Sequence, residues 1–201
     1  MASIKHTKNE LKTQREALRR FQRYLPTLQL KKQQLQLEVR QLEVTLETER
    51  NAEAQDRAEL AKWVRLFAEP VDWDHWLTVS DIRLEQGNIA GVAIPVLAGV
   101  DFSREMPDLF STPAWLDDGV EMLQRRIRRR LELQVLGEQL RRLADELRTT
   151  NQRVNLFEKV KIPEARENIR VIRIFLGDQM TAGVARSKMA KAKALEQETA
   201  T

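Results

Sequence analysis

A short stretch from Asp72 to Trp76 carries the residue types that most often bind metals. It reads Asp72-Trp-Asp-His75-Trp76, so two carboxylates stand beside a histidine. A zinc site needs three or four converging ligands, and His6, the other histidine of the chain, lies far away in the sequence. We therefore expect a surface turn anchored by its tryptophans, with no metal and no cofactor.

The densest basic run could recognise an anion. It contains Arg125, Arg126, Arg128, Arg129 and Arg130. Three interpretations stay open: a solvated helix face offset by nearby glutamates, a contact with an acidic protein, and a nucleic-acid contact. The run has no interleaved aromatic residue on which a base could stack. Since the chain carries a net charge of only +4, we expect no nucleic-acid partner.

The sequence also lacks the common signatures of catalysis. No glycine is followed by Lys-Ser or Lys-Thr, so a phosphate-binding loop is missing, and Gly-x-Gly-x-x-Gly is absent as well. The chain has no cysteine, which removes thiolate chemistry. We expect no catalytic residue, no nucleotide site and no enzymatic activity of its own.

The longest apolar run does not predict a membrane span. It extends from Ile89 to Val100 and is interrupted by Gly91, Pro95 and Gly99, whereas a spanning helix needs roughly 20 apolar residues. The N-terminal residues also lack the apolar core of a secretion signal. We expect a soluble chain without direct membrane insertion.

Long helices must position these residues, because 32% of the chain is charged and only 5% is aromatic. Thr7 and Glu10 have the spacing of a capping box that opens a first helix. A heptad follows, with polar interruptions at Gln14 and Lys32. Its two columns are Leu11, Leu18, Leu25, Val39 and Leu46, and Phe21, Leu28, Leu35 and Leu42.

Pro26 interrupts this helix. A proline inside a helix removes one hydrogen bond and costs about 3 kcal/mol. Because the heptad keeps its phase across Pro26, we expect a kink, although a break into two helices stays open. The helix should end near Ala68, where Glu69-Pro70 stops it.

A second helical region is predicted from Ala114 onward. It has a less regular apolar seam, whose main members are Leu136, Leu140, Leu143, Leu147, Val154, Phe157, Ile162, Ile169 and Ile172. Two long helices joined by a short excursion should pack antiparallel, because the chain must return.

The excursion between the helices has β-type sequence. Glu85 to Asn88 resembles a turn, and the run from Ile89 to Val100 favours a strand. We expect a β-hairpin there, seated on a small core of Trp63, Trp73, Trp76 and Trp115.

The predicted fold is all-α: a long antiparallel, left-handed coiled coil with a small inserted β-hairpin region. The expected domains are an N-terminal arm (1–69), an inserted hairpin region (70–113), a C-terminal arm (114–186) and a frayed basic tail (187–201).

Three blocks of this sequence resemble one family. The first is Thr7-Lys-Asn-Glu-Leu11, the second is Asn88-Ile-Ala-Gly91-Val followed by Pro95, and the third is Arg153-Val-Asn155 with Glu158 and Ile162-Pro163. In this order and over nearly the whole chain, they are similar to the D subunit, the central-stalk rotor subunit of V-type (A/V-type) ATPases and ATP synthases. Pro26 departs from the family pattern, which indicates a divergent bacterial member.

The resemblance implies a rotor shaft that couples ATP hydrolysis or synthesis to proton or sodium transport. Its implied partners are the catalytic A and B subunits, the small rotor F subunit near the hairpin, and the socket that the C subunit forms above the membrane ring. The implied location is cytoplasmic and peripheral to the membrane. Two alternatives stay open from the residues alone: a homo-oligomeric coiled-coil scaffold or tether, and a nucleic-acid-binding protein that uses the arginine run.

Overall fold

The computed structural model describes residues 4–69, 71–105 and 112–199. The chain forms two compact units. Unit 1 consists of Met1–Leu30 with Thr150–Thr201, and unit 2 consists of Lys31–Thr149. Long helices with one inserted hairpin make up the described chain, so the predicted all-α fold class is confirmed.

The first helix, α1, extends from Lys8 to Trp63. It is capped by Thr7, whose Oγ1 accepts the Glu10 backbone N–H at 3.2 Å. Pro26 lies inside α1 and does not end it. The α-helix stops at Trp63, and a 3₁₀ segment, Val64–Ala68, completes the stretch that the sequence predicted as helix.

The hairpin consists of β1 (Leu77–Ile89) and β2 (Val92–Arg104), paired antiparallel. Its turn is Ala90-Gly91, where φ is 52° and 80°, and Asn88 Oδ1 accepts the Gly91 N–H at 2.9 Å. The turn predicted at residues 85–88 is therefore wrong, because those residues pair with β2. Gly87 instead permits close packing: a Cβ there would lie 2.8 Å from Val96 Cγ2.

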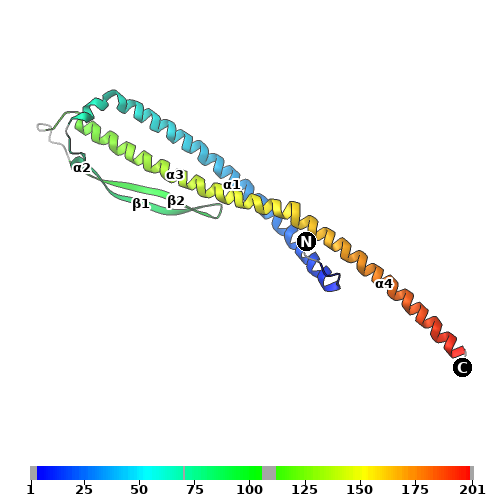
Figure 1. Ribbon diagram of the computed structural model, residues 1–201. Coiled ribbons are helices and arrows are strands. Elements are labelled where there is room, and N and C mark those ends of the chain that lie inside the picture. Colours follow the sequence, from blue (N-terminus) through cyan, green and yellow to red (C-terminus); the bar gives the residue numbers. More distant parts are fainter. Residues whose placement is uncertain (1–3, 70, 106–111, 200–201) are drawn as a thin grey trace. The chain divides into compact units, whose positions relative to one another are not determined.

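In unit 2, the hairpin and two helical segments share one core. Leu35 of α1, Ile94 of β2 and Leu143 of α3 (Leu116–Leu156) are buried against one another. Ion pairs join Lys31 to Glu146 at 2.6 Å and Asp56 to Arg129 at 2.5 Å. Because the residue numbers run in opposite directions, α1 and α3 are antiparallel here, and the hairpin lies beside α3 (Figure 1).

In unit 1, the beginning of α1 pairs with the later part of the chain. The rings of Phe21 and Phe157 lie 5.2 Å apart, and Asn168 donates to Gln14 at 3.4 Å. The pairing is again antiparallel. The buried apolar residues on the later side are Val154, Ile162, Ala165, Ile169 and Ile172.

A π-helical segment, Phe157–Lys161, separates α3 from α4 (Ile162–Thr199). The Ile162 N–H reaches back five residues to the Phe157 carbonyl. The seam positions of unit 1 on this side are Thr150, Val154, Phe157, Ile162, Ala165, Ile169 and Ile172. Neighbouring seam positions are three or four residues apart except from Phe157 to Ile162, where the step is five. One extra residue in the wide turn therefore keeps the seam on one face of the helix, just ahead of Pro163.

An aromatic cluster in unit 2 lies where the insertion leaves the helices. The rings of Phe67 and Trp73 stack at 4.9 Å, and Trp115 lies 5.4 Å from Phe67 and 5.9 Å from Trp73. Trp76, at the end of the short helix α2 (Trp73–Trp76), contacts His75 instead, with the rings 4.8 Å apart. The predicted contribution of the Trp63 side chain lies outside the described residues.

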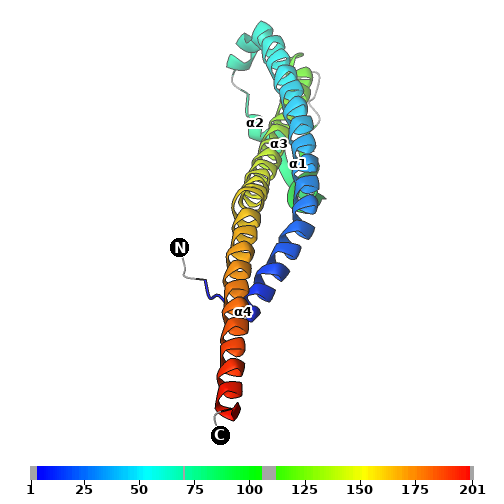
Figure 2. The same ribbon diagram turned by 90° about the vertical axis from the view of Figure 1, so that its right-hand side faces the viewer.

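The last part of α4 is exposed. The helix continues to Thr199, through most of the range predicted as a tail. Residues 177–194 are exposed apart from the half-buried Gly183. Within unit 1, this end of α4 continues past the N-terminal end of α1 (Figure 2). In the described ranges, we find no helix with a stretch both long and apolar enough to cross a bilayer.

Candidate functional site

The candidate site of a chain without catalytic signatures is the helix pairing itself. None of the predicted seam residues is exposed. The buried members are Leu35, Leu46, Leu143, Val154, Ile162, Ile169 and Ile172. The half-buried members are Leu11, Leu18, Phe21, Leu25, Leu28, Val39, Leu42, Leu136, Leu140, Leu147 and Phe157. Each fully buried aliphatic side chain contributes about 1.5–3 kcal/mol.

Two arginines of the basic run form ion pairs between α3 and α1 within unit 2. Arg129 contacts Asp56 at 2.5 Å and Glu49 at 3.7 Å, and the Arg129 and Asp56 side chains are only 23% and 13% exposed. Arg130 lies 3.9 Å from Glu53. These pairs join α3 to α1, so part of the basic run is used within the unit and does not form a free anion-binding surface.

Two more members of the run also have local partners. Arg125 lies 3.5 Å from Glu121, one helical turn away. The Arg128 guanidinium carbon lies 5.9 Å from the centre of the Phe102 ring, which connects α3 to β2 by a cation–π contact.

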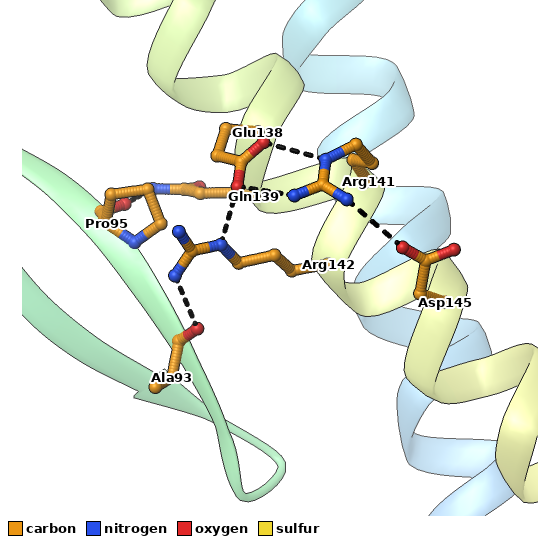
Figure 3. A network of polar contacts seen from close by, with 7 residues as sticks. All are labelled: Ala93, Pro95, Glu138, Gln139, Arg141, Arg142 and Asp145. Carbon is orange, nitrogen blue, oxygen red and sulfur yellow. Dashed lines mark hydrogen bonds and ion pairs between the residues drawn. The ribbon is translucent and has the colours of Figure 1, made fainter.

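A polar network attaches the hairpin to α3 (Figure 3). Gln139 Nε2 donates to the Pro95 carbonyl at 2.6 Å, and Arg142 Nη1 donates to the Ala93 carbonyl at 3.2 Å. Gln139 is only 8% exposed. Since both acceptors are backbone atoms of β2, the network holds the strand itself and not its side chains.

Glu138 organises the arginine side of this network. Its carboxylate accepts two hydrogen bonds from Arg141 at 2.8 Å and one from Arg142 at 2.7 Å. The hydrogen bonds from Arg141, and then from Arg142, lower the pKa of Glu138 from 4.5 to about 2. The same contact with Glu138 raises the pKa of Arg141. The carboxylate therefore stays ionised and holds Arg142 in place for the hairpin.

The residues of the second and third blocks that carry the family resemblance fall into two places. Asn88, Gly91 and Pro95 build the hairpin turn and its attachment to α3. The others lie around the π segment: the exposed Arg153 and the half-buried Asn155 before it, the exposed Glu158 within it, and the exposed Pro163 as the second residue of α4.

Gln139 and Arg142 were not identified from the sequence as the residues that donate hydrogen bonds to the hairpin backbone. They lie among the seam leucines of α3, and a helical periodicity assigns polar residues there to the solvent side. These two residues could be identified only once the position of the hairpin against α3 was known.

In the turn from Asp72 to Trp76, the histidine has a carboxylate partner. His75 Nε2 lies 3.1 Å from Glu105 Oε2. Within the ranges that the structure describes, no group of three His, Asp or Glu side chains could hold a metal ion.

Comparisons with known proteins identify a family that this chain resembles. A family model described as the D subunit of ATP synthase matches residues 10–192. The chain is 43% identical over 196 residues to the V-type ATP synthase D subunit of Borreliella burgdorferi, and the match covers 98% of this chain and 97% of that relative. It is 34% identical to the protein of that name from Chlamydia muridarum, and the match covers 96% of each chain. The corresponding Chlamydia trachomatis serovar L2 protein is 35% identical, with the same coverage.

Proposed function

Because the chain belongs to the family of ATP synthase D subunits, we propose that it is the central rotor shaft of a V-type ATPase or ATP synthase. As such a shaft it couples ATP hydrolysis or synthesis in a hexamer of A and B subunits to the translocation of protons or sodium ions. The coupling is mechanical, through rotation of the shaft, and the chain catalyses no reaction itself. The observation that carries the proposal is the similarity to named D subunits over almost the full length.

The helix pairing inside each unit supports this role. A shaft transmits torque only if its helices turn together. In unit 2, the buried contact of Leu35 with Leu143 and the ion pair of Asp56 with Arg129 join α1 to α3. In unit 1, Phe21 against Phe157 does the same. An apolar seam with partly buried charge pairs resists both separation and sliding, because either motion leaves charges or apolar surface without partners.

The proposed partners follow from the family. The A and B subunits surround the shaft, the small F subunit lies near the hairpin, and the socket formed by the C subunit receives the shaft above the membrane ring. An asymmetric shaft presents different faces to three catalytic sites at any moment, which makes their states differ. The proposed location is the cytoplasmic side, peripheral to the membrane, as part of the membrane-bound complex.

Matched substitutions in unit 2 test the coupling. Leu143 is fully buried between α1 and β2, whereas Leu37 is 57% exposed on α1. A complex assembled with Leu143→Asp should lose ATP-driven ion transport, because a carboxylate in the seam opens the helix pair. Leu37→Asp should retain it. Transport is measured in vesicles and ATP hydrolysis in solution, where the Leu143→Asp complex keeps measurable turnover.

Two results would contradict the proposal. One is full coupled transport with Leu143→Asp in a complex verified to contain the chain. The other is a wild-type chain that forms only homo-oligomers and binds neither the A nor the B subunits, which would favour the scaffold alternative.

A further inference from the structure

Unit 1 is strongly basic, although the whole chain is not. It contains 17 Lys and Arg residues against 8 Asp and Glu, a net charge of +9. Unit 2 contains 17 against 22, a net charge of −5, and together they give the +4 of the chain. An unbalanced surface of this kind attracts an acidic partner.

Four of the basic residues of unit 1 line one groove. Two arginines of α1, Arg15 and Arg19, and two of α4, Arg166 and Arg173, line it. All four are exposed. Leu18 and Ile169 form an apolar floor between them, and Gln22 adds a neutral polar group. The groove therefore combines four guanidinium groups from two helices with an apolar base, and none of the residues that line it is acidic.

The neighbouring carboxylates have other partners. Glu16 pairs with Lys12 at 4.0 Å, and Glu164 pairs with Lys161 at 3.0 Å. Glu167 accepts hydrogen bonds from Arg170 at 2.6 and 2.9 Å, which lower the pKa of Glu167. These three carboxylates are therefore paired with Lys12, Lys161 and Arg170, none of which lines the groove.

We propose that this groove is a docking site for a carboxylate-rich segment of another protein. Guanidinium groups bind carboxylates in a bidentate manner, and four of them on two helices can grip successive acidic side chains. The apolar floor accepts an aliphatic or aromatic side chain from the same segment. No aromatic residue lines the groove to stack a base, which disfavours single-stranded nucleic acid as the occupant. The inference rests on the proposed function, in which the A and B subunits supply the acidic segment.

Two double variants with equal charge change separate the groove from general electrostatics. The groove variant is Arg19→Glu with Arg166→Glu. The control variant is Arg20→Glu with Arg186→Glu, which alters two exposed arginines of the same unit that do not line the groove. Circular dichroism checks helix content. If the groove variant loses helix, Arg19→Gln with Arg166→Gln replaces it, with the matching control.

The full-length chain is titrated with the A/B hexamer and with poly-L-glutamate. Loss of two charge-assisted contacts should weaken both affinities by roughly ten- to a hundredfold in the groove variant, and the difference should shrink at higher salt. The control variant should stay within about threefold of wild type, the change expected from one or two rim charges. Equal weakening of both variants, or of neither, on poly-L-glutamate overturns the inference.

Two further outcomes are informative. Groove-dependent binding of single-stranded RNA or of phosphatidylglycerol vesicles, with unchanged binding of the hexamer and of poly-L-glutamate, also overturns it. In the second outcome, the wild-type chain fails to bind the hexamer while the groove variant, and not the control variant, loses affinity for poly-L-glutamate. That result would contradict the proposed function but would still support the docking groove.

Discussion

Glu138 illustrates how much one half-buried carboxylate can organise. It carries hydrogen bonds from Arg141 and Arg142, and Arg142 in turn reaches the Ala93 carbonyl of the hairpin. Protonation of Glu138 would remove the acceptor that orients Arg142. The attachment of the hairpin to α3 should therefore depend on pH.

The direction of that dependence follows from the lowered pKa. Folding moves the pKa of Glu138 from 4.5 to about 2, so its contribution to stability is fully present above about pH 4.5 and is lost as the pH falls toward 2. Carboxyl NMR titration of the folded chain should give a midpoint near 2 for Glu138. The thermal midpoint of Glu138→Gln should approach that of wild type as the pH falls through this window. A difference between the two midpoints that stays constant from about pH 5 to about 2 would contradict the prediction.

Gly91 permits a second residue-scale prediction. Its φ of +80° lies in the left-handed region, so Gly91→Ala should lower the free energy of unfolding by about 1 kcal/mol. The control is Gly177→Ala. Gly177 lies inside α4, and nothing stands within 4 Å of the added Cβ. There alanine should not lower the free energy of unfolding, because a helix interior favours alanine over glycine. Urea denaturation measures both, and equal effects would contradict the assigned turn.

At the scale of elements, the sequence reveals the helices and their buried faces well. Leucines at heptad spacing, such as Leu35 and Leu42, identify a face because burial repeats with the helical period. The residues typical of turns did not predict the position of the hairpin turn correctly. Gly87 looked like a turn residue, yet it lies in β1, where it makes room for Val96. A single sequence does not say whether a glycine serves a turn or a close approach.

The π segment also could not be predicted from the sequence, although the spacing of the apolar residues is consistent with it. The step of five between Phe157 and Ile162 could equally mark an end of one helix and the start of another. Pro163 supports either interpretation. Only the hydrogen bond from Ile162 back to Phe157 identifies a wide turn inside a continuing helix.

Single-residue deletions test the wide turn. Deleting Val160, in a Pro163→Ala background, shortens the step from five to four and should preserve the seam, with the free energy of unfolding changed by about 1 kcal/mol or less. Deleting Gln152 in the same background rotates the following residues by about 100°. That change should cost about 3 kcal/mol or more, because buried side chains leave the seam. Both positions are exposed, so a comparable loss for both deletions would refute the phase-keeping role.

At the scale of the molecule, the exposed end of α4 provides a test of the proposed assembly. A helix without a packed face is marginal in water, and residues 177–194 have almost no buried surface. In the free chain, the amides of this segment should exchange hydrogen far faster than those around the buried Ile169 and Ile172. After assembly with A and B subunits, exchange should slow by roughly tenfold or more if the hexamer encloses the helix. Hydrogen–deuterium exchange mass spectrometry measures both states, and unchanged exchange after assembly would exclude enclosure.

The attachment of the hairpin through the carbonyls of Ala93 and Pro95 has an evolutionary consequence. Every amino acid supplies a carbonyl, so this contact by itself places no demand on the side chains at positions 93 and 95. Gln139 and Arg142 supply specific donors and lack that freedom. As far as this contact is concerned, substitutions should therefore be tolerated better at positions 93 and 95 of the strand than at Gln139 and Arg142 of the helix.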